Sequence, residues 1–127
     1  MQRYEERRED LKNAYERLKE GLAIEKPDDL HLDGILQRFE FTFELAWKTV
    51  KDYLTYQGFT EKTGSPREII QLGYQQGIIE DGEAWIKMML ARNSISHLYD
   101  EETSREIYQA IKQNYIVLLD KLLKKLN

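Results

Sequence analysis

The chain has 127 residues, 19 of them basic and 23 acidic, and a formal net charge of −4. This length suits a single domain over residues 1–127, and the acidic balance argues against general coating of nucleic acid while leaving room for a local phosphate site. The lack of cysteine excludes disulfides and thiolate chemistry, two histidines are too few for a histidine-rich metal cage, and no apolar run approaches the ~20 residues of a membrane span. We therefore expect a cytoplasmic protein away from membranes, without metal or other cofactor, and the N-terminal residues MQRYEERRED lack the apolar core of a signal peptide.

Hydrophobic residues recur with a helical period from end to end, so the chain is predicted to be all-α. A first helix is expected over about 2–24, with an apolar stripe at three- and four-residue steps opposite a charged face. After a loop at 26–29, in which Asp28 or Asp29 can act as a cap, a second helix is expected over about 30–57. This second helix is apolar on more than one side, which is typical of a helix at the centre of a fold or facing a partner chain.

A third helix is predicted from its N-terminal residues. Ser65 is an N-cap, Pro66 suits the first helical position, and Glu68 completes a capping box three residues after the cap. This helix is short and is expected to end at Gly77.

A fourth helix is expected to begin after Asp81 and to run through Leu98. A fifth is expected to start at Asp100 or at Thr103, where Thr103 and Glu106 fit another capping box, and to continue to the C-terminus. No strand-like alternation is present between them. The predicted fold is an up-and-down bundle of about five helices, with one long antiparallel pair at its heart.

Polar side chains gather near the end of the fourth expected helix, in the stretch RNSISHLY at 92–99. Arg92 can pair bidentately with phosphate, and His97 can move a proton near neutral pH, so together they can cleave RNA without a metal. The Tyr99 hydroxyl offers another chemistry, as the acceptor of a transferred nucleotide. Arg92 and His97 lie about 140° apart around an ideal helix, so a second copy of the chain or a bent helix end would help to bring them to one phosphate. A polar helix end whose histidine bonds a neighbouring loop is the commoner explanation when the residues are considered alone.

Arg92, His97 and Tyr99 also match a longer pattern, in which an arginine is followed by four residues, a histidine, one residue and a tyrosine. On this pattern the chain resembles the HEPN superfamily, and within it the nucleotidyltransferase substrate-binding or HepT-like branch. The resemblance covers about residues 4–120. Three other stretches carry it: RFEFTFELAWK at 38–48, SPRE at 65–68, and GII at 77–79 followed by Trp85.

The resemblance implies a HEPN-type helical bundle that forms a homodimer and is often bound to a separate small nucleotidyltransferase subunit. Where activity is present, it implies metal-independent RNA cleavage in which Arg92 binds phosphate, His97 is the general acid or base, and Asn93 supports them. It also implies that the partner silences this activity by transferring AMP to Tyr99. Through residues 39–48 the chain resembles most the substrate-binding branch, which is named for a helper role rather than for a demonstrated cleavage.

Three functions follow, and they stay open. The chain can be a non-catalytic subunit that positions a substrate for the nucleotidyltransferase, and this is the function we favour. It can instead be the RNase toxin of a toxin–antitoxin pair, with RNA as its ligand. In the third, the polar groups of the motif satisfy one another across the two-fold axis of a dimer and have only a structural role.

Two carboxylates of the second helix, Glu40 and Glu44, lie four residues apart amid aromatic residues. Such a pair can serve in acid–base chemistry or in metal binding. We favour the interpretation that they face solvent or pair with Lys48 and Lys51. The alternative is that one of them orients Arg92.

Overall fold

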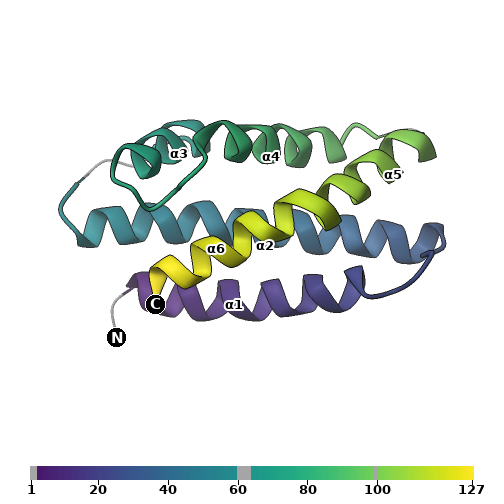
Figure 1. The fold of residues 1–127 in the computed structure, drawn as a ribbon, viewed down its shortest axis with the longest axis horizontal. Coiled ribbons are helices and arrows are strands. Elements are labelled where there is room, and N and C mark those ends of the chain that lie inside the picture. Colours follow the sequence, from purple (N-terminus) through teal and green to yellow (C-terminus); the bar gives the residue numbers. More distant parts are fainter. Residues whose placement is uncertain (1–2, 60–63, 99) are drawn as a thin grey trace.

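The computed structural model describes residues 3–59, 64–98 and 100–127, and this part of the chain is helical with no strand. Figure 1 shows successive lengths of helix that run up and down one bundle. The all-α, up-and-down fold predicted from the periodicity is therefore confirmed. The helices are α1 (Arg3–Leu22), α2 (Asp29–Tyr56), α3 (Pro66–Gln75), α4 (Gly82–Ile95), α5 (Glu101–Ala110), the π-helical η1 (Ile111–Tyr115) and α6 (Ile116–Leu126).

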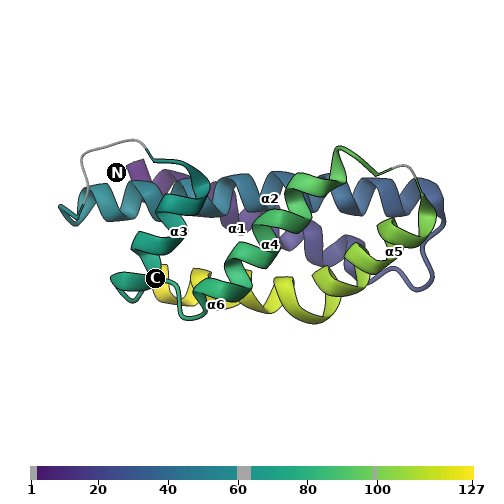
Figure 2. The same ribbon diagram turned by 90° about the horizontal axis from the view of Figure 1, so that it is seen from above.

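The long antiparallel pair at the heart of the bundle is α1 and α2, which make the most extensive contact between any two helices in the described residues. Short helices α3 and α4 follow one another along α2, and both contact it. The C-terminal helical segments return across the pair, where α5 contacts α2 and α6 contacts α1 (Figures 1 and 2). Helix α2 therefore touches α1, α3, α4 and α5, as its apolar character on more than one side predicts.

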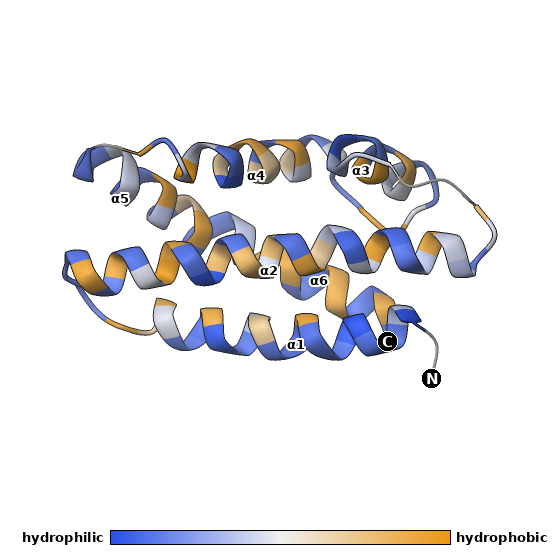
Figure 3. Ribbon diagram, turned by 180° about the vertical axis from the view of Figure 1, so that it is seen from behind, coloured by the Kyte–Doolittle hydropathy of each residue, from blue (hydrophilic) through white to orange (hydrophobic). Residues whose placement is uncertain are grey.

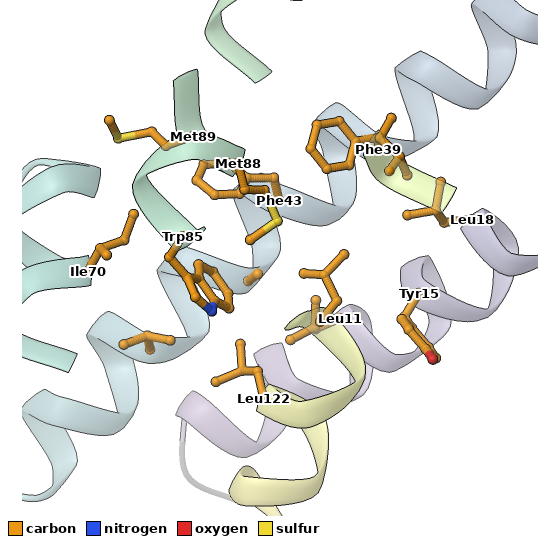
Figure 4. Packing of buried hydrophobic residues seen from close by; sticks show 14 of the residues in the cluster. Leu11, Tyr15, Leu18, Phe39, Phe43, Ile70, Trp85, Met88, Met89 and Leu122 are labelled. Atoms are coloured by element: carbon orange, nitrogen blue, oxygen red, sulfur yellow. The ribbon is translucent and has the colours of Figure 1, made fainter. Parts of the chain in front are cut away.

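The core lies between these helices and draws on all of them. Figure 4 shows Phe43, Trp85 and Met88 packed together where α2 meets α4, and the ring centroids of Phe43 and Trp85 are 6.3 Å apart. Apolar side chains at three- and four-residue steps on α1, such as Leu11 and Leu18, are buried against the same core. Figure 3 shows the complementary pattern on the outside, where hydrophilic residues cover the outer side of α1.

The predicted helix starts are confirmed at three caps. The carboxylate of Asp28 accepts the backbone N–H of His31 at 2.8 Å, so Asp28 rather than Asp29 caps α2. At α3, the hydroxyl of Ser65 accepts the backbone N–H of Glu68 at 3.2 Å, and the Glu68 carboxylate accepts the backbone N–H of Ser65 at 3.4 Å. Asp81 caps α4. Each side chain satisfies an N–H group that the first helical turn leaves without a partner.

Two helices end at glycines in the left-handed region. Gly58 follows α2 with φ of 80°, and Gly77 follows α3 with φ of 82°. In both turns the next residue donates its N–H back to the last helical turn: Phe59 to Leu54 at 2.9 Å and Ile78 to Gly73 at 3.0 Å. This is the Schellman arrangement, which a residue without Cβ adopts without strain.

The structure corrects the expected end of the fourth helix. Helix α4 ends at Ile95 and does not run through Leu98. The serine hydroxyls of this segment bond to backbone carbonyls, Ser94 to Ala91 at 2.8 Å and Ser96 to Asn93 at 3.3 Å, and such bonds compete with the helical pattern.

The expected capping box at Thr103 is also wrong, because α5 starts at Glu101 and follows Asp100. Thr103 therefore lies inside the first turn, where its hydroxyl donates to the Asp100 carboxylate at 3.0 Å. The sequence alternatives for this start were Asp100 and Thr103, and the structure selects the first.

The expected fifth helix contains a π-helical turn at Ile111–Tyr115. In an ideal α-helix the eight steps from Ile111 to Leu119 rotate about 80° beyond two full turns, which would separate the side chains of these two residues. Both side chains are nonetheless fully buried. The wider π turn absorbs part of that rotation, so the apolar stripe stays on the core.

Among the helices of the described residues, none combines the length and the apolar character that crossing a membrane requires.

Candidate functional site

Arg92 lies in the last turn of α4 and reaches across to α2. Its Nη2 is 3.2 Å from Oε1 of Glu44, and the two side chains keep 31% and 32% of their surface exposed. Arg92 is therefore half-buried and already paired with a carboxylate of the same chain. The sequence offered the alternative that Glu40 or Glu44 orients Arg92, and the structure has a contact with Arg92 at Glu44.

The second oxygen of Glu44 is also engaged. Oε2 accepts the indole N–H of Trp47 at 3.2 Å, and Nζ of Lys48 lies 3.9 Å from it. Residues three and four apart share one side of a helix, so the short spacing 44–47–48 builds this arrangement within one turn of α2. The favoured pairing of Glu44 with Lys48 is thus present, although its contact with Arg92 is shorter.

The positive charges around Glu44 outnumber the single carboxylate. Arg92 and Lys48 approach it directly, and Nζ of Lys51 lies 5.9 Å from the centroid of the Trp47 ring. Glu40, one turn earlier on α2, is half-buried and takes part in none of the hydrogen bonds or ion pairs of the described residues. The spot is locally cationic in a chain whose net charge is −4.

One donor of the Arg92 guanidinium is unsatisfied. Nε is buried and has no hydrogen-bond partner within residues 3–59, 64–98 and 100–127. An unsatisfied buried donor costs about 1 to 3 kcal/mol, and native structures keep few of them. Arg92 is therefore not held in the arrangement that maximises its own hydrogen bonds.

His97 lies in a different environment. It follows the end of α4, its backbone N–H donates to the carbonyl of Ser94 at 2.9 Å, and its side chain is exposed. The imidazole makes no hydrogen bond or ion pair with the rest of the described chain. Asn93 is exposed as well. The structure brings Arg92 to Glu44, whereas it leaves Asn93 and His97 open to solvent.

Tyr99, the expected modification acceptor, lies outside the described residues. Its neighbour Leu98 is half-buried and packs against the hydrophobic core. Asp100, on the other side, precedes α5.

A groove of about 670 Å³ lies between α1 and α2. Phe41, with 61% of its surface exposed, lines it together with Gly34 and Leu45. On α4, Leu90 is 50% exposed. The exposed Phe41 thus agrees with the prediction that the second helix is apolar on more than one side.

Known proteins resemble this chain along nearly its whole length. A family model described as nucleotidyltransferase substrate binding protein like matches residues 6–127. The probable ribonuclease HepT of Haemophilus influenzae is 31% identical over 86 residues, which are 65% of this chain and 59% of that protein. The match thus spans less than two thirds of this relative.

Two solved structures share the fold. A protein from Thermus thermophilus has a TM-score of 0.84 at 29% identity, with 92% of this chain and 98% of that one covered. A Haemophilus influenzae protein, whose structure reveals the fold of a substrate binding domain of a nucleotidyltransferase, has a TM-score of 0.82 at 24% identity, covering 94% of this chain and 98% of that one. On the family match over residues 6–127, the chain belongs to the nucleotidyltransferase substrate-binding protein-like family, as its resemblance to the HepT-like branch predicts.

Proposed function

We propose that the chain is the partner subunit of a separate small nucleotidyltransferase and acts as a homodimer in a two-component, toxin–antitoxin-like system. The observation that carries this proposal is the division of the candidate site. Arg92 is held by Glu44, while His97 is exposed and its side chain has no partner among the described residues. A site that is incomplete in one chain suits a subunit that presents a phosphate-binding arginine to another protein.

We assign the homodimer contact to the outer side of α4. Ile86, Leu90 and Asn93 recur there at four- and three-residue steps, and Leu90 is exposed. The Phe41 groove between α1 and α2 is then left for the nucleotidyltransferase.

Molar mass from light scattering shows which of these two surfaces forms the dimer. Leu90→Asp places a charge on the proposed dimer contact and is expected to give a monomer, whereas Phe41→Asp is expected to stay dimeric. Circular dichroism checks that both variants remain helical. A dimer that persists in Leu90→Asp and dissociates in Phe41→Asp reverses the assignment.

The second candidate function is metal-independent RNA cleavage. Arg92 and His97 with the motif spacing support it, as does the name of the relative, probable ribonuclease HepT. A base removes the proton of a ribose 2′-hydroxyl, the 2′-oxygen attacks the phosphorus, and the bond to the 5′-oxygen breaks as an acid protonates that oxygen. The products are a 2′,3′-cyclic phosphate and a 5′-hydroxyl. In this reaction Arg92 stabilises the charged phosphate and His97 transfers a proton, with Asn93 in support.

Incubation with total tRNA in EDTA tests this second function. Cleavage that is lost in both Arg92→Ala and His97→Ala supports the RNase. If the protein does not cleave tRNA at any concentration, or if both variants cleave like the wild type, the RNase function is rejected. A purely structural motif would instead show a large loss of thermal stability in His97→Ala.

The proposed modification is transfer of AMP from ATP to Tyr99. The phenolic oxygen attacks the α-phosphorus, pyrophosphate leaves, and the phenolic proton is lost to a base. Intact-mass measurement after incubation with the nucleotidyltransferase, Mg²⁺ and ATP is expected to show one added AMP in the wild type and none in Tyr99→Phe. An addition that persists in Tyr99→Phe rejects Tyr99 as the acceptor.

A further inference from the structure

A chain of polar contacts connects α2 to the candidate phosphate-binding arginine. The indole N–H of Trp47 donates to Oε2 of Glu44 at 3.2 Å, and Oε1 of Glu44 lies 3.2 Å from Nη2 of Arg92. We propose that Glu44 is the positioning residue of Arg92 and that Trp47 fixes Glu44. This inference rests on the proposal that Arg92 is the phosphate-binding group.

The burial of this contact argues against a mainly stabilising role. Both side chains keep about a third of their surface exposed, and ion pairs with that much solvent contribute little to folding. The contact can instead assist ligand binding by orienting Arg92, because an arginine side chain loses much rotamer freedom when it binds a ligand. A guanidinium that is already held in place loses less of that freedom on binding.

Glu44 is itself well placed to hold another side chain. It lies in α2 directly after Phe43, which is fully buried in the core, so its backbone is fixed. Both of its oxygens have partners, so the carboxylate cannot rotate without breaking a contact with Trp47 or with Arg92. Supporting residues of this kind are what hold a binding group to its productive geometry.

The local charge still favours an anion. Within the described residues, Arg92 and Lys48 approach Glu44, and Lys51 lies over the ring of Trp47, which bonds Glu44; the nearby carboxylates are those of Glu44 and of Glu40 one turn earlier. A phosphate that binds Arg92 beside Lys48 therefore meets a net positive charge. The carboxylate of Glu44 contacts one nitrogen of the guanidinium, and the positive charge of the site as a whole remains.

The opposite role is physically distinct. If Glu44 only competed with phosphate for Arg92, its removal would strengthen anion binding. If Glu44 positions Arg92, its removal weakens binding, although the chain loses a negative charge. Glu40→Gln is the matched control, because it removes the same charge from the same helix and Glu40 has no contact with Arg92 in the described structure.

The experiment measures binding of a fluorescein-labelled single-stranded RNA decamer by anisotropy, in EDTA and at low salt. Relative to Glu40→Gln, we expect Glu44→Gln and Glu44→Ala to weaken binding by about 2- to 10-fold, which is the range for losing the immobilisation of one side chain. Trp47→Phe removes no charge, so it is compared with the wild type and is expected to weaken binding in the same range. In parallel, NMR of the ¹⁵N-labelled arginine side chains follows the Nε–H signal of Arg92. That signal is expected to shift and broaden in the three variants and to stay unchanged in Glu40→Gln.

The outcomes are separable. If Arg92→Ala loses RNA binding while Glu44→Ala binds as tightly as Glu40→Gln or more tightly, the positioning role is overturned and Arg92 keeps its proposed function. If Arg92→Ala binds RNA no differently from the wild type, the proposed phosphate-binding function fails. The NMR signal then decides alone: an Arg92 Nε–H signal unchanged in Glu44→Ala contradicts positioning, and a changed one supports it.

Discussion

The rings of Phe39 and Tyr115 lie nearly parallel, with 5.8 Å between their centroids and 19° between their planes. Phe39 is fully buried in α2, and Tyr115 is the last residue of the π-helical turn. The stack therefore fixes the irregular turn of the C-terminal helix against the central helix. Burial raises the pKa of Tyr115, which agrees with a hydroxyl partly withdrawn from water.

Truncation of this ring should destabilise the fold. We expect Tyr115→Ala to lower the free energy of unfolding by about 2 to 4 kcal/mol, because it removes core packing and an aromatic pair. Tyr115→Phe keeps the ring and should change it by less than about 0.5 kcal/mol. Urea unfolding followed by circular dichroism measures both. Equal losses in the two variants would show that the hydroxyl, and not the stack, holds the turn.

The two capping boxes that the sequence suggests should contribute differently to the free energy of unfolding. Ser65→Ala removes an N-cap and is expected to lower the free energy of unfolding by about 1 kcal/mol. Thr103→Ala lies inside the first turn of α5 and should have an effect below about 0.5 kcal/mol. Thermal melts of the two variants provide the comparison, and a larger loss in Thr103→Ala would contradict the start of α5.

Two helical glycines should respond to alanine with opposite signs. A Cβ at Gly34 would meet nothing within 4 Å, so Gly34→Ala is expected to raise the free energy of unfolding by about 0.5 to 1 kcal/mol through the helical preference of alanine. A Cβ at Gly73 would lie 3.0 Å from Cδ1 of Ile79 and 3.2 Å from Cγ1 of Val50. Gly73→Ala should therefore cost about 1 to 3 kcal/mol by overpacking. Chemical denaturation distinguishes the two, and a stabilised Gly73→Ala would refute the close packing of α3.

Ionisation of Tyr15 should lower the free energy of unfolding at alkaline pH. Its hydroxyl donates to Oδ1 of Asp120 at 3.2 Å, and burial together with that carboxylate raises its pKa from 10.0 to about 12. The folded state therefore holds the phenolic proton more tightly than the unfolded chain. Its contribution is complete below pH 10.0 and is lost as the pH rises toward about 12.

The matched variant is Tyr15→Phe. We expect the stability advantage of the wild type over this variant to be constant up to about pH 10 and to shrink above it. Urea titrations from pH 8 to 12 measure the difference, and comparison with the variant removes the contribution of other groups. An advantage that grows with pH would contradict the raised pKa.

The parts of the fold that the sequence predicted are those with local causes. Ser65 and Glu68 form their box within one turn, and Gly77 ends α3 because of its own backbone freedom. The π turn at Ile111–Tyr115 was not predicted, because it follows from the demand that Ile111 and Leu119 face one core. Such a demand depends on packing between distant segments and leaves no local pattern.

The candidate site shows the same division. The spacing of Arg92 and His97 was visible in the sequence, and so was the four-residue step between Glu44 and Lys48. The contact of Glu44 with Arg92 joins residues on two helices, so the sequence offered it only as an alternative. The early end of α4 at Ile95, which leaves His97 in a turn, depends on hydroxyl bonds that compete with the helix.

The most direct test of the partner role is the molar mass of the assembly. Size-exclusion chromatography with light scattering would be applied to the chain alone and after mixing with the small nucleotidyltransferase proposed as its partner. We predict twice the 15.2 kDa of one chain for the protein alone, and a larger complex that contains both proteins after mixing. A protein that stays at 15.2 kDa and elutes apart from the nucleotidyltransferase at every concentration would contradict the proposed role.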